Sequence, residues 1–101
     1  MRITTSMLDK RNRIMSIVSR ETGVPTDDIM SETRRRKVAS ARMMVMWALY
    51  TYCGYSTKTI GILMRRHHTS VVYAIGMING GYRLSKDEKA LKKMLGEEVS
   101  R

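Results

Sequence analysis

Acidic residues are missing from the middle of this sequence, because no aspartate or glutamate occurs between Glu32 and Asp87. That interval, residues 33–86, holds ten lysines and arginines, while the nine basic residues outside it are balanced by all nine acidic residues. The formal net charge of +10 therefore belongs entirely to the central part of the chain. A region of one sign attracts polyanions, and nucleic acid is the first to consider. The alternative is a basic solvated surface that has no partner.

Other absences narrow the class of protein. The single cysteine, Cys53, cannot form an internal disulfide, which fits a reducing cytoplasm, and its apolar neighbours predict core packing. No apolar run is long enough for a transmembrane helix, and the N-terminus lacks the apolar segment of a signal peptide. Paired carboxylates, a nucleophile with its base and a metal-ligand cluster are not evident either. We therefore expect no enzyme activity, no cofactor, no metal, no small-molecule substrate and no membrane partner.

The apolar pattern predicts an all-α fold of five to six helices in a single domain, residues 1–101, with its core over about 8–95. Strand-like alternation is absent, and apolar residues recur at spacings of three and four. The predicted helices cover residues 8–22, 26–30, 38–53, 56–64 and 69–79, and a last helix follows residue 85. The 38–53 segment, with Trp47 as a large anchor, is the expected central helix, and the ten methionines are expected to fill the core.

Residues that typically cap or end helices support these helix boundaries. Ser6 with Asp9 and Ser85 with Glu88 resemble capping boxes, and Ser56 is a plausible N-cap. Helix ends are expected at Gly23, Gly54 and the pair Gly80-Gly81. Gly61 lies inside a predicted helix, where it either allows close approach of another segment or is merely tolerated.

The helices at 56–64 and 69–79, joined by a short turn, have the spacing of a helix-turn-helix. In that motif the second helix enters the major groove of DNA and its first residues meet base edges. Here the turn and helix start read RRHHTS, and the following residues Val71, Val72, Ile75 and Ile78 are expected to point inward. Hydroxyls, imidazoles and guanidinium groups at this place suit bases and phosphates.

Each part of this motif also has a simpler interpretation. The adjacent histidines could bind a metal, although no third ligand has suitable spacing. Thr69 or Ser70 could serve only as the helix N-cap. Helix pairs at this spacing also occur in proteins that bind no DNA.

Three segments carry a family resemblance: RIMSIVSRETGVPTDDIM, TRRRKVASARMMVMWALY and YSTKTIGILMRRHHTSVVYAI. From about Arg13 to Leu95 the chain resembles domain IV, the C-terminal DNA-binding domain, of the bacterial replication initiator DnaA. That family has a helix, a short helix, a basic loop, a long helix and a helix-turn-helix with the signature Asp-His-Thr-Thr-Val. The resemblance implies a Trp-repressor-like helical fold that binds double-stranded DNA.

Residue roles follow from the resemblance. It implies that Arg34, in a basic loop over residues 34–37, reaches the minor groove and that Arg42 contacts the DNA backbone. Lys58 matches the approach of the first motif helix, and His68 with Thr69 matches the His-Thr that reads the major groove. Ser70 keeps the hydroxyl of the second signature threonine, and Val71 matches the signature valine, a core position. The predicted DNA-contacting set comprises Arg34, Arg35, Arg36, Lys37, Arg42, Lys58, Arg65, Arg66, His67, His68, Thr69 and Ser70.

Departures from the family pattern are also visible. His67 stands where the family has an aspartate, an acceptor that can read cytosine, and histidine cannot simply copy that contact. The turn Met64-Arg65-Arg66 is one residue shorter and more basic than the family's Gly-Gly-Arg, and Met43 replaces a frequent glutamine. The sequence has no P-loop and no room for the ATPase domain of the initiator. It is either an excised domain or a stand-alone relative from a mobile element or phage, and the start MRITTSMLDK favours the second.

The function predicted from the sequence is sequence-specific binding of double-stranded DNA in the cytoplasm, at the nucleoid. The resemblance adds a role in replication initiation or its regulation, with other replication or regulatory proteins as candidate partners. The alternatives are a transcriptional regulator from a mobile element, an RNA-binding helical protein, and a helical adaptor or membrane-surface protein.

Overall fold

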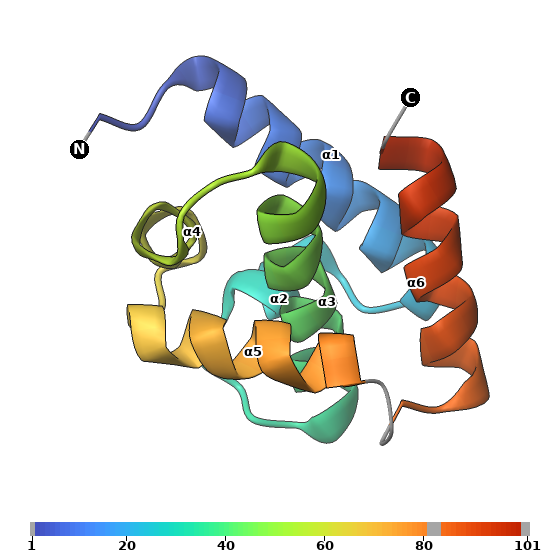
Figure 1. Ribbon diagram of the computed structural model, residues 1–101. Helices are drawn as coiled ribbons and strands as arrows, with labels where there is room; N and C mark the ends of the chain where they lie inside the picture. The colour runs from blue at the N-terminus through green and yellow to red at the C-terminus, as the bar shows by residue number, and fades with distance from the viewer. Residues whose placement is uncertain (1, 81–83, 100–101) are drawn as a thin grey trace.

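Six helices make up the part of the chain that the computed structural model describes, residues 2–80 and 84–99 (Figure 1). No strand occurs in these residues, so the predicted all-α fold is confirmed. Three helices begin earlier than predicted, α1 at Thr5, α3 at Arg36 and α5 at His68, and the other helix bounds lie within a residue or two of expectation. The helices are α1 (Thr5–Thr22), α2 (Thr26–Met30), α3 (Arg36–Cys53), α4 (Thr57–Met64), α5 (His68–Gly80) and α6 (Lys86–Val99).

Most of the predicted helix boundaries are made by the expected residues. Gly23 and Gly54 end α1 and α3 in the left-handed conformation, with φ of 75° and 70°. The side chain of Ser56 accepts from the backbone N–H of Thr59 at 3.1 Å. The box at Ser85 and Glu88 is also confirmed, because each backbone N–H donates to the side chain of the other. Gly80 is the last residue of α5, and Gly81 lies outside the described residues.

The capping box predicted at Ser6 and Asp9 is wrong. Thr4 is the N-cap of α1, in an extended conformation, and its hydroxyl accepts from the backbone N–H of Met7 at 3.2 Å. Ser6 already lies within the first helical turn, so it cannot take the non-helical conformation that an N-cap requires.

The long helix α3 runs through the middle of the molecule, with α4 on one side of it, α6 on the other and α5 crossing in front of it (Figure 1). It is buried on most sides, as expected of a central helix, and Trp47 is only 3% exposed. Met44, Met46 and Met64 are buried in the same core, which bears out core filling by methionine at these positions. Cys53 is partly buried and packs against this core, as predicted. Burial raises the pKa of its thiol, although the charge of Lys10 acts in the opposite direction.

The register of α5 differs from expectation at one residue. Val71, Ala74 and Ile78 are fully buried and Ile75 is partly buried, but Val72 is 54% exposed. Residues at spacings of three and four share a helix face, so Val72, next to Val71, points away from the core. The prediction that Val72 points inward is therefore wrong.

The C-terminal helix α6 holds the end of α5 through polar contacts as well as packing. The ammonium of Lys92 lies 5.4 Å from the centre of the Trp47 ring and donates to the carbonyl of Ile78 at 2.9 Å. The indole N–H of Trp47 donates to Asn79 at 2.8 Å. These contacts satisfy polar groups at the end of α5 and fix its axis relative to α3 and α6.

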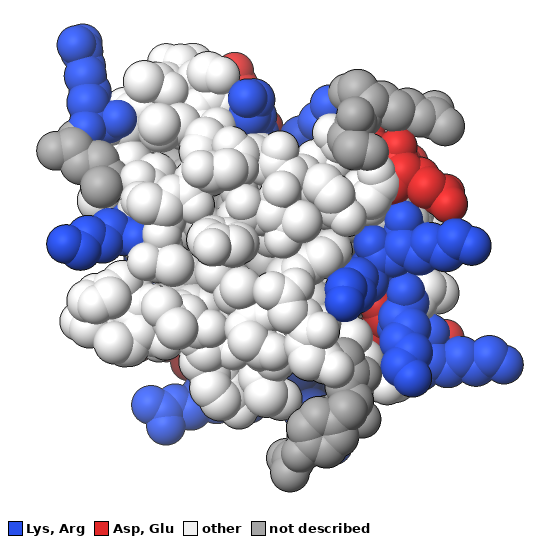
Figure 2. Space-filling view, in the orientation of Figure 1, with Lys and Arg blue, Asp and Glu red and all other residues white. Residues whose placement is uncertain are grey.

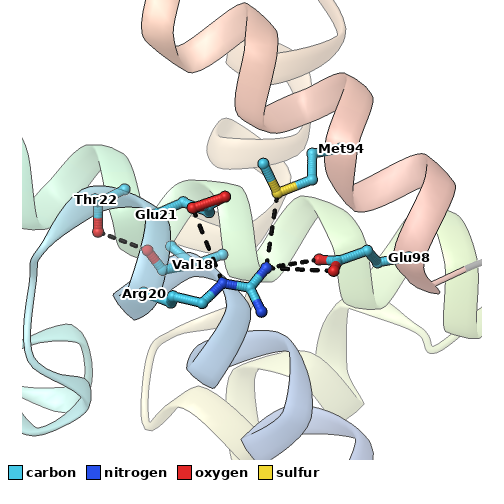
Figure 3. A network of polar contacts seen from close by, with 6 residues as sticks. All are labelled: Val18, Arg20, Glu21, Thr22, Met94 and Glu98. Carbon is cyan, nitrogen blue, oxygen red and sulfur yellow. Dashed lines mark hydrogen bonds and ion pairs between the residues drawn. The ribbon is translucent and has the colours of Figure 1, made fainter.

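A polar network joins α6 to α1 on the other side (Figure 3). The guanidinium of Arg20 donates to the carboxylate of Glu98 at 3.0 Å and lies 3.9 Å from the sulfur of Met94. Both charged side chains are well exposed, and such surface pairs contribute little to stability. The buried side chains of Leu91 and Leu95 therefore dominate the docking of α6, and the network orients it.

Arg42 is a charged residue within the fold, and it is only 7% exposed. Its Nε donates to the carbonyl of Ile29 at 2.8 Å, and its Nη2 donates to that of Ser31 at 2.7 Å. The carbonyls of Asp28 and Thr33 lie 3.3 and 3.2 Å from the same nitrogen. Burial lowers the pKa of this guanidinium, and the nearby charge of Arg66 lowers it further. Arg42 thus ties α2 and the segment after it to α3.

The burial of Arg42 bears on its expected contact with the DNA backbone, which stays a prediction. A guanidinium that is buried among protein carbonyls is not presented to solvent, so Arg42 does not offer itself to a DNA phosphate in this structure. The sequence could not distinguish this arginine from its exposed neighbours, because its ligands are backbone carbonyls, which any residue supplies.

Gly61 is required by a close approach and is not merely tolerated. A Cβ at this position would lie 2.6 Å from the backbone oxygen of Arg66 and 3.5 Å from the backbone nitrogen of His68. The backbone N–H of Arg66 also donates to the carbonyl of Gly61 at 2.8 Å. The turn between α4 and α5 therefore lies directly against the backbone of α4.

We expect Arg42→Lys to lower the free energy of unfolding by about 3 kcal/mol, because lysine cannot satisfy several divergent carbonyls with one ammonium. Urea denaturation followed by circular dichroism measures this change. The matched control is Arg35→Lys at an exposed position, which should change stability little. Equal stability of the two variants would show that the carbonyls do not depend on Arg42.

We expect Gly61→Ala to destabilise the protein by at least about 1 kcal/mol, because the new methyl group meets backbone that cannot move aside. Gly76→Ala is the matched control, since no atom lies within 4 Å of the Cβ position there. Alanine should stabilise that helix by up to about 1 kcal/mol. Thermal unfolding of both variants measures the two changes, and a shift of the same sign for both would contradict the close approach.

Candidate nucleic-acid interface

The segments predicted as a helix-turn-helix form one, since α4 and α5 pack against each other across a short turn (Figure 1). The turn begins at Arg65, which ends α4 in the left-handed conformation with φ of 56° and ψ of 44°. Arg65 is the only residue other than glycine with a positive φ among residues 2–80 and 84–99. An L-residue in this conformation carries strain of about 1 kcal/mol or more, which glycine avoids. The turn thus has an arginine where glycine would be the less strained residue.

Basic side chains gather around this turn. A shallow hollow, which we call the cationic notch, is lined by Lys58, Gly61, Ile62, Arg65, Arg66, His67 and His68. The charged groups in this lining are all cationic, and no carboxylate is among them. The fold therefore brings five members of the predicted DNA-contacting set to one place, at the start of α5.

The start of α5 is capped by His67. Its Nδ1 lies 3.3 Å from the backbone N–H nitrogen of Thr69 and 2.8 Å from the hydroxyl of Thr69. The rings of His67 and His68 lie 4.4 Å apart at an interplanar angle of 33°. Thr69 and Ser70 are exposed in the first turn of α5, so neither is the residue that precedes the helix. The alternative that one of these hydroxyls is only an N-cap is not supported by this arrangement.

Arg66 connects the turn to the segment that follows α2. It is half-buried, and its Nη2 donates to the carbonyl of Ser31, which also accepts from Arg42. This shared carbonyl places residues 31–35 beside the cationic notch. Part of the guanidinium of Arg66 is therefore committed to the protein, although Arg66 also lines the notch.

The predicted basic loop is divided by the start of α3. Arg34 and Arg35 are exposed in the loop, whereas Arg36 and Lys37 already belong to the first turn of α3. These two residues line a different hollow, between α1, α3 and α6, whose lining also includes Glu21, Asp87 and Glu88. The predicted loop over residues 34–37 is thus a loop only to Arg35, and Arg36 and Lys37 line a hollow that also has carboxylates in its lining.

Glu88 shows the electrostatics of that second hollow. Burial acts to raise the pKa of its carboxyl, but hydrogen bonds from Ser40 and Ser85 outweigh it, and the charge of Arg36 adds to them. The pKa of Glu88 is therefore lowered. The carboxylates in this hollow offset part of the positive potential that a polyanion would meet at Arg36.

Three exposed apolar side chains on the motif helices were missed from the sequence. Ile62 on α4 is 53% exposed, and Val72 and Tyr73 on α5 are 54% and 64% exposed. Helical phase relative to the buried Val71 and Ala74 could have placed Val72 and Tyr73 outward. Ile62 lines the cationic notch, so it lies where a base or a sugar would also be close.

Charge is unevenly distributed over the surface, as Figure 2 shows. The face in view, over α3, α4 and α5, is largely uncharged, and lysine and arginine side chains project from its edges. The side of α6 carries both signs, since this helix contains four acidic and four basic residues. On this face, lysine and arginine side chains therefore lie at the edges and not in the middle.

Residues 2–80 and 84–99 offer no group of three or more histidine, cysteine or carboxylate side chains that could hold a metal ion. Within the same residues, no helix has the length and apolar character needed to cross a membrane.

Comparisons with known proteins agree with this architecture. Residues 11–78 match the family described as bacterial dnaA protein helix-turn-helix. The chromosomal replication initiator protein DnaA of Thermotoga maritima is 32% identical over 97 residues, covering 93% of this chain and 22% of that protein. The DnaA of Gloeobacter violaceus is 32% identical over 87 residues, covering 85% of this chain and 20% of that protein.

A solved structure shares the fold as well. The crystal structure of a DNA replication initiation factor superposes with a TM-score of 0.80 at 25% identity, covering 93% of this chain and 29% of that chain. The present chain spans about a fifth of the length of the curated relatives that it matches. The matched residues include the helix-turn-helix and the cationic notch. By sequence and by fold, this chain belongs to the bacterial DnaA helix-turn-helix family.

Proposed function

We propose that this chain binds double-stranded DNA sequence-specifically, with the start of α5 in the major groove. The observation that carries the proposal is the cationic notch. Exposed hydrogen-bonding side chains begin α5 there, and the charged residues that line the notch are all cationic. Cations beside a helix start attract phosphates, and the side chains of the first helical turn can reach base edges. Catalysis forms no part of the proposed function.

The proposal divides the predicted set by what each side chain is free to do. Lys58 and Arg65 are exposed at the notch and suit phosphates on either side of the groove. His68, Thr69 and Ser70 are exposed at the start of α5 and face the bases. Arg34 and Arg35 extend the contact to the backbone or the minor groove, whereas Arg36 and Lys37 lie farther from it.

Two arginines act mainly through the protein in this proposal. Arg42 and, in part, Arg66 hold the loop at residues 31–35 against the notch through the carbonyl of Ser31. Their loss should displace the loop arginines as a group, because the loop is fixed to the notch through these contacts.

A role in replication initiation or its regulation is proposed from the family. The curated relatives are chromosomal replication initiators, and this chain corresponds to about a fifth of their length. We propose that the chain acts at the nucleoid, where other replication or regulatory proteins are candidate partners.

The test is selection from random duplexes at about 150 mM salt, where nonspecific attraction is damped. We expect the wild-type protein to enrich one motif, and the double variant His68→Ala/Thr69→Ala to lose that enrichment while keeping most nonspecific affinity. No enrichment by the wild type, with binding that disappears as salt rises, would leave only a basic surface. Tighter binding to structured RNA than to any duplex would favour the RNA-binding alternative.

We expect Arg65→Gly to separate stability from DNA binding. Glycine relieves the left-handed conformation, so the free energy of unfolding should rise by up to about 1 kcal/mol. Loss of one phosphate contact should reduce the slope of log K against log salt by about 1. The matched control is Lys93→Ala on α6, which removes one exposed charge outside the notch and should leave the slope unchanged. An unchanged slope for Arg65→Gly would place Arg65 outside the DNA contact.

A further inference from the structure

The hydrogen bonds of His67 fix the position of its ring proton. The backbone N–H of Thr69 can only donate, and it is directed at Nδ1 of His67, 3.3 Å away. Nδ1 must therefore act as the acceptor, and the hydroxyl of Thr69, at 2.8 Å, is placed to donate to the same nitrogen. A neutral imidazole carries one proton, so this proton lies on Nε2.

The other ring nitrogen of His67, Nε2, is therefore a donor. His67 is exposed, and no hydrogen bond to its Nε2 occurs within the described part of the chain. The ring cannot readily exchange its two nitrogens, because a rotation that brought Nε2 to Thr69 would break the cap of α5. The tilted contact with the ring of His68, at 4.4 Å, further restricts its orientation.

The surroundings of His67 reinforce this donor character. Lys58, Arg65 and Arg66 share the cationic notch with it, and ammonium and guanidinium groups donate only. No carboxylate lines the notch, so no side chain there offers the strong acceptor that a cytosine amino group would need.

Base edges in the major groove differ in what they offer to such a donor. Guanine presents two acceptors, N7 and O6, whereas cytosine presents only its amino donor. Adenine and thymine each present one acceptor next to a donor or a methyl group. Guanine, with two acceptors, is thus the base that best suits a hydrogen-bond donor surrounded by cationic side chains.

We propose that His67 is a specificity-determining residue that selects guanine, donating from Nε2 to N7 or O6 of the base. This inference rests on the proposed function, since it names the base that the start of α5 reads. It also gives this chain a preference opposite to that of an acceptor at the same place.

Two substitutions isolate the donor while keeping the cap. Aspartate and asparagine are both good N-caps, and either can accept from the N–H of Thr69 through one side-chain oxygen. The other side-chain atom then faces outward, as an acceptor oxygen in His67→Asp and as an amino donor in His67→Asn. The two variants have nearly the same size and differ in the hydrogen bond that they offer.

The experiment selects duplexes with the full chain as wild type, His67→Asn and His67→Asp. We expect guanine at one position of the wild-type motif, the same guanine with His67→Asn, and cytosine at that position with His67→Asp, while the other positions stay unchanged. Exchanging that guanine for cytosine should weaken wild-type binding roughly tenfold. The same base at every position for wild type and His67→Asp would overturn the inference and leave sequence-specific binding intact.

A measurement without DNA tests the premise separately. NMR of the ring nitrogens in the free protein, at about pH 8, should show the proton of His67 on Nε2 and a bare Nδ1. A proton on Nδ1 would overturn the inference whatever the selection gives. Absence of any enriched motif for the wild type would instead overturn the proposed function, on which the inference rests.

Discussion

The carbonyl of Ser31 is the point on which the arrangement of this surface depends. It accepts from Arg42, which reaches it from inside the fold, and from Arg66, which reaches it from the turn of the helix-turn-helix. One backbone oxygen thus joins α3, the segment after α2 and the turn before α5. Because two guanidinium groups meet there, their mutual repulsion must be offset by the other carbonyls around Arg42. The positions of Arg34 and Arg35 in the loop depend on these contacts to the carbonyl of Ser31.

Two residues of the turn region, Gly61 and Arg65, differ in how their side chains suit the backbone. Gly61 has no side chain because the carbonyl of Arg66 occupies that space, while Arg65 keeps a side chain in a conformation that favours glycine. Strain of this kind persists where the surrounding structure enforces it, and it is frequent at functional sites. Here it presents a guanidinium at the edge of the cationic notch, next to the start of α5.

The helix that would enter the groove is fixed at both ends and along one side. His67 caps its start, Val71 and Ala74 pack in the core, and Lys92 of α6 binds the carbonyl of Ile78 near its end. A helix held in this way can present Thr69 and Ser70 with little loss of side-chain or backbone freedom on binding. The sixth helix therefore helps to hold α5 in place.

The helices, most of their caps, the helix-turn-helix and the concentration of positive charge could be predicted from the sequence, because periodicity, capping and charge are local properties of the chain. The sequence did not reveal that Arg42 is buried or that Arg36 lies near the carboxylate of Glu88. These two points follow from tertiary contacts, since each depends on atoms distant in sequence. The proposed donor on His67 depends on tertiary geometry as well, because it is inferred from the contacts of Nδ1 with Thr69 at the start of α5.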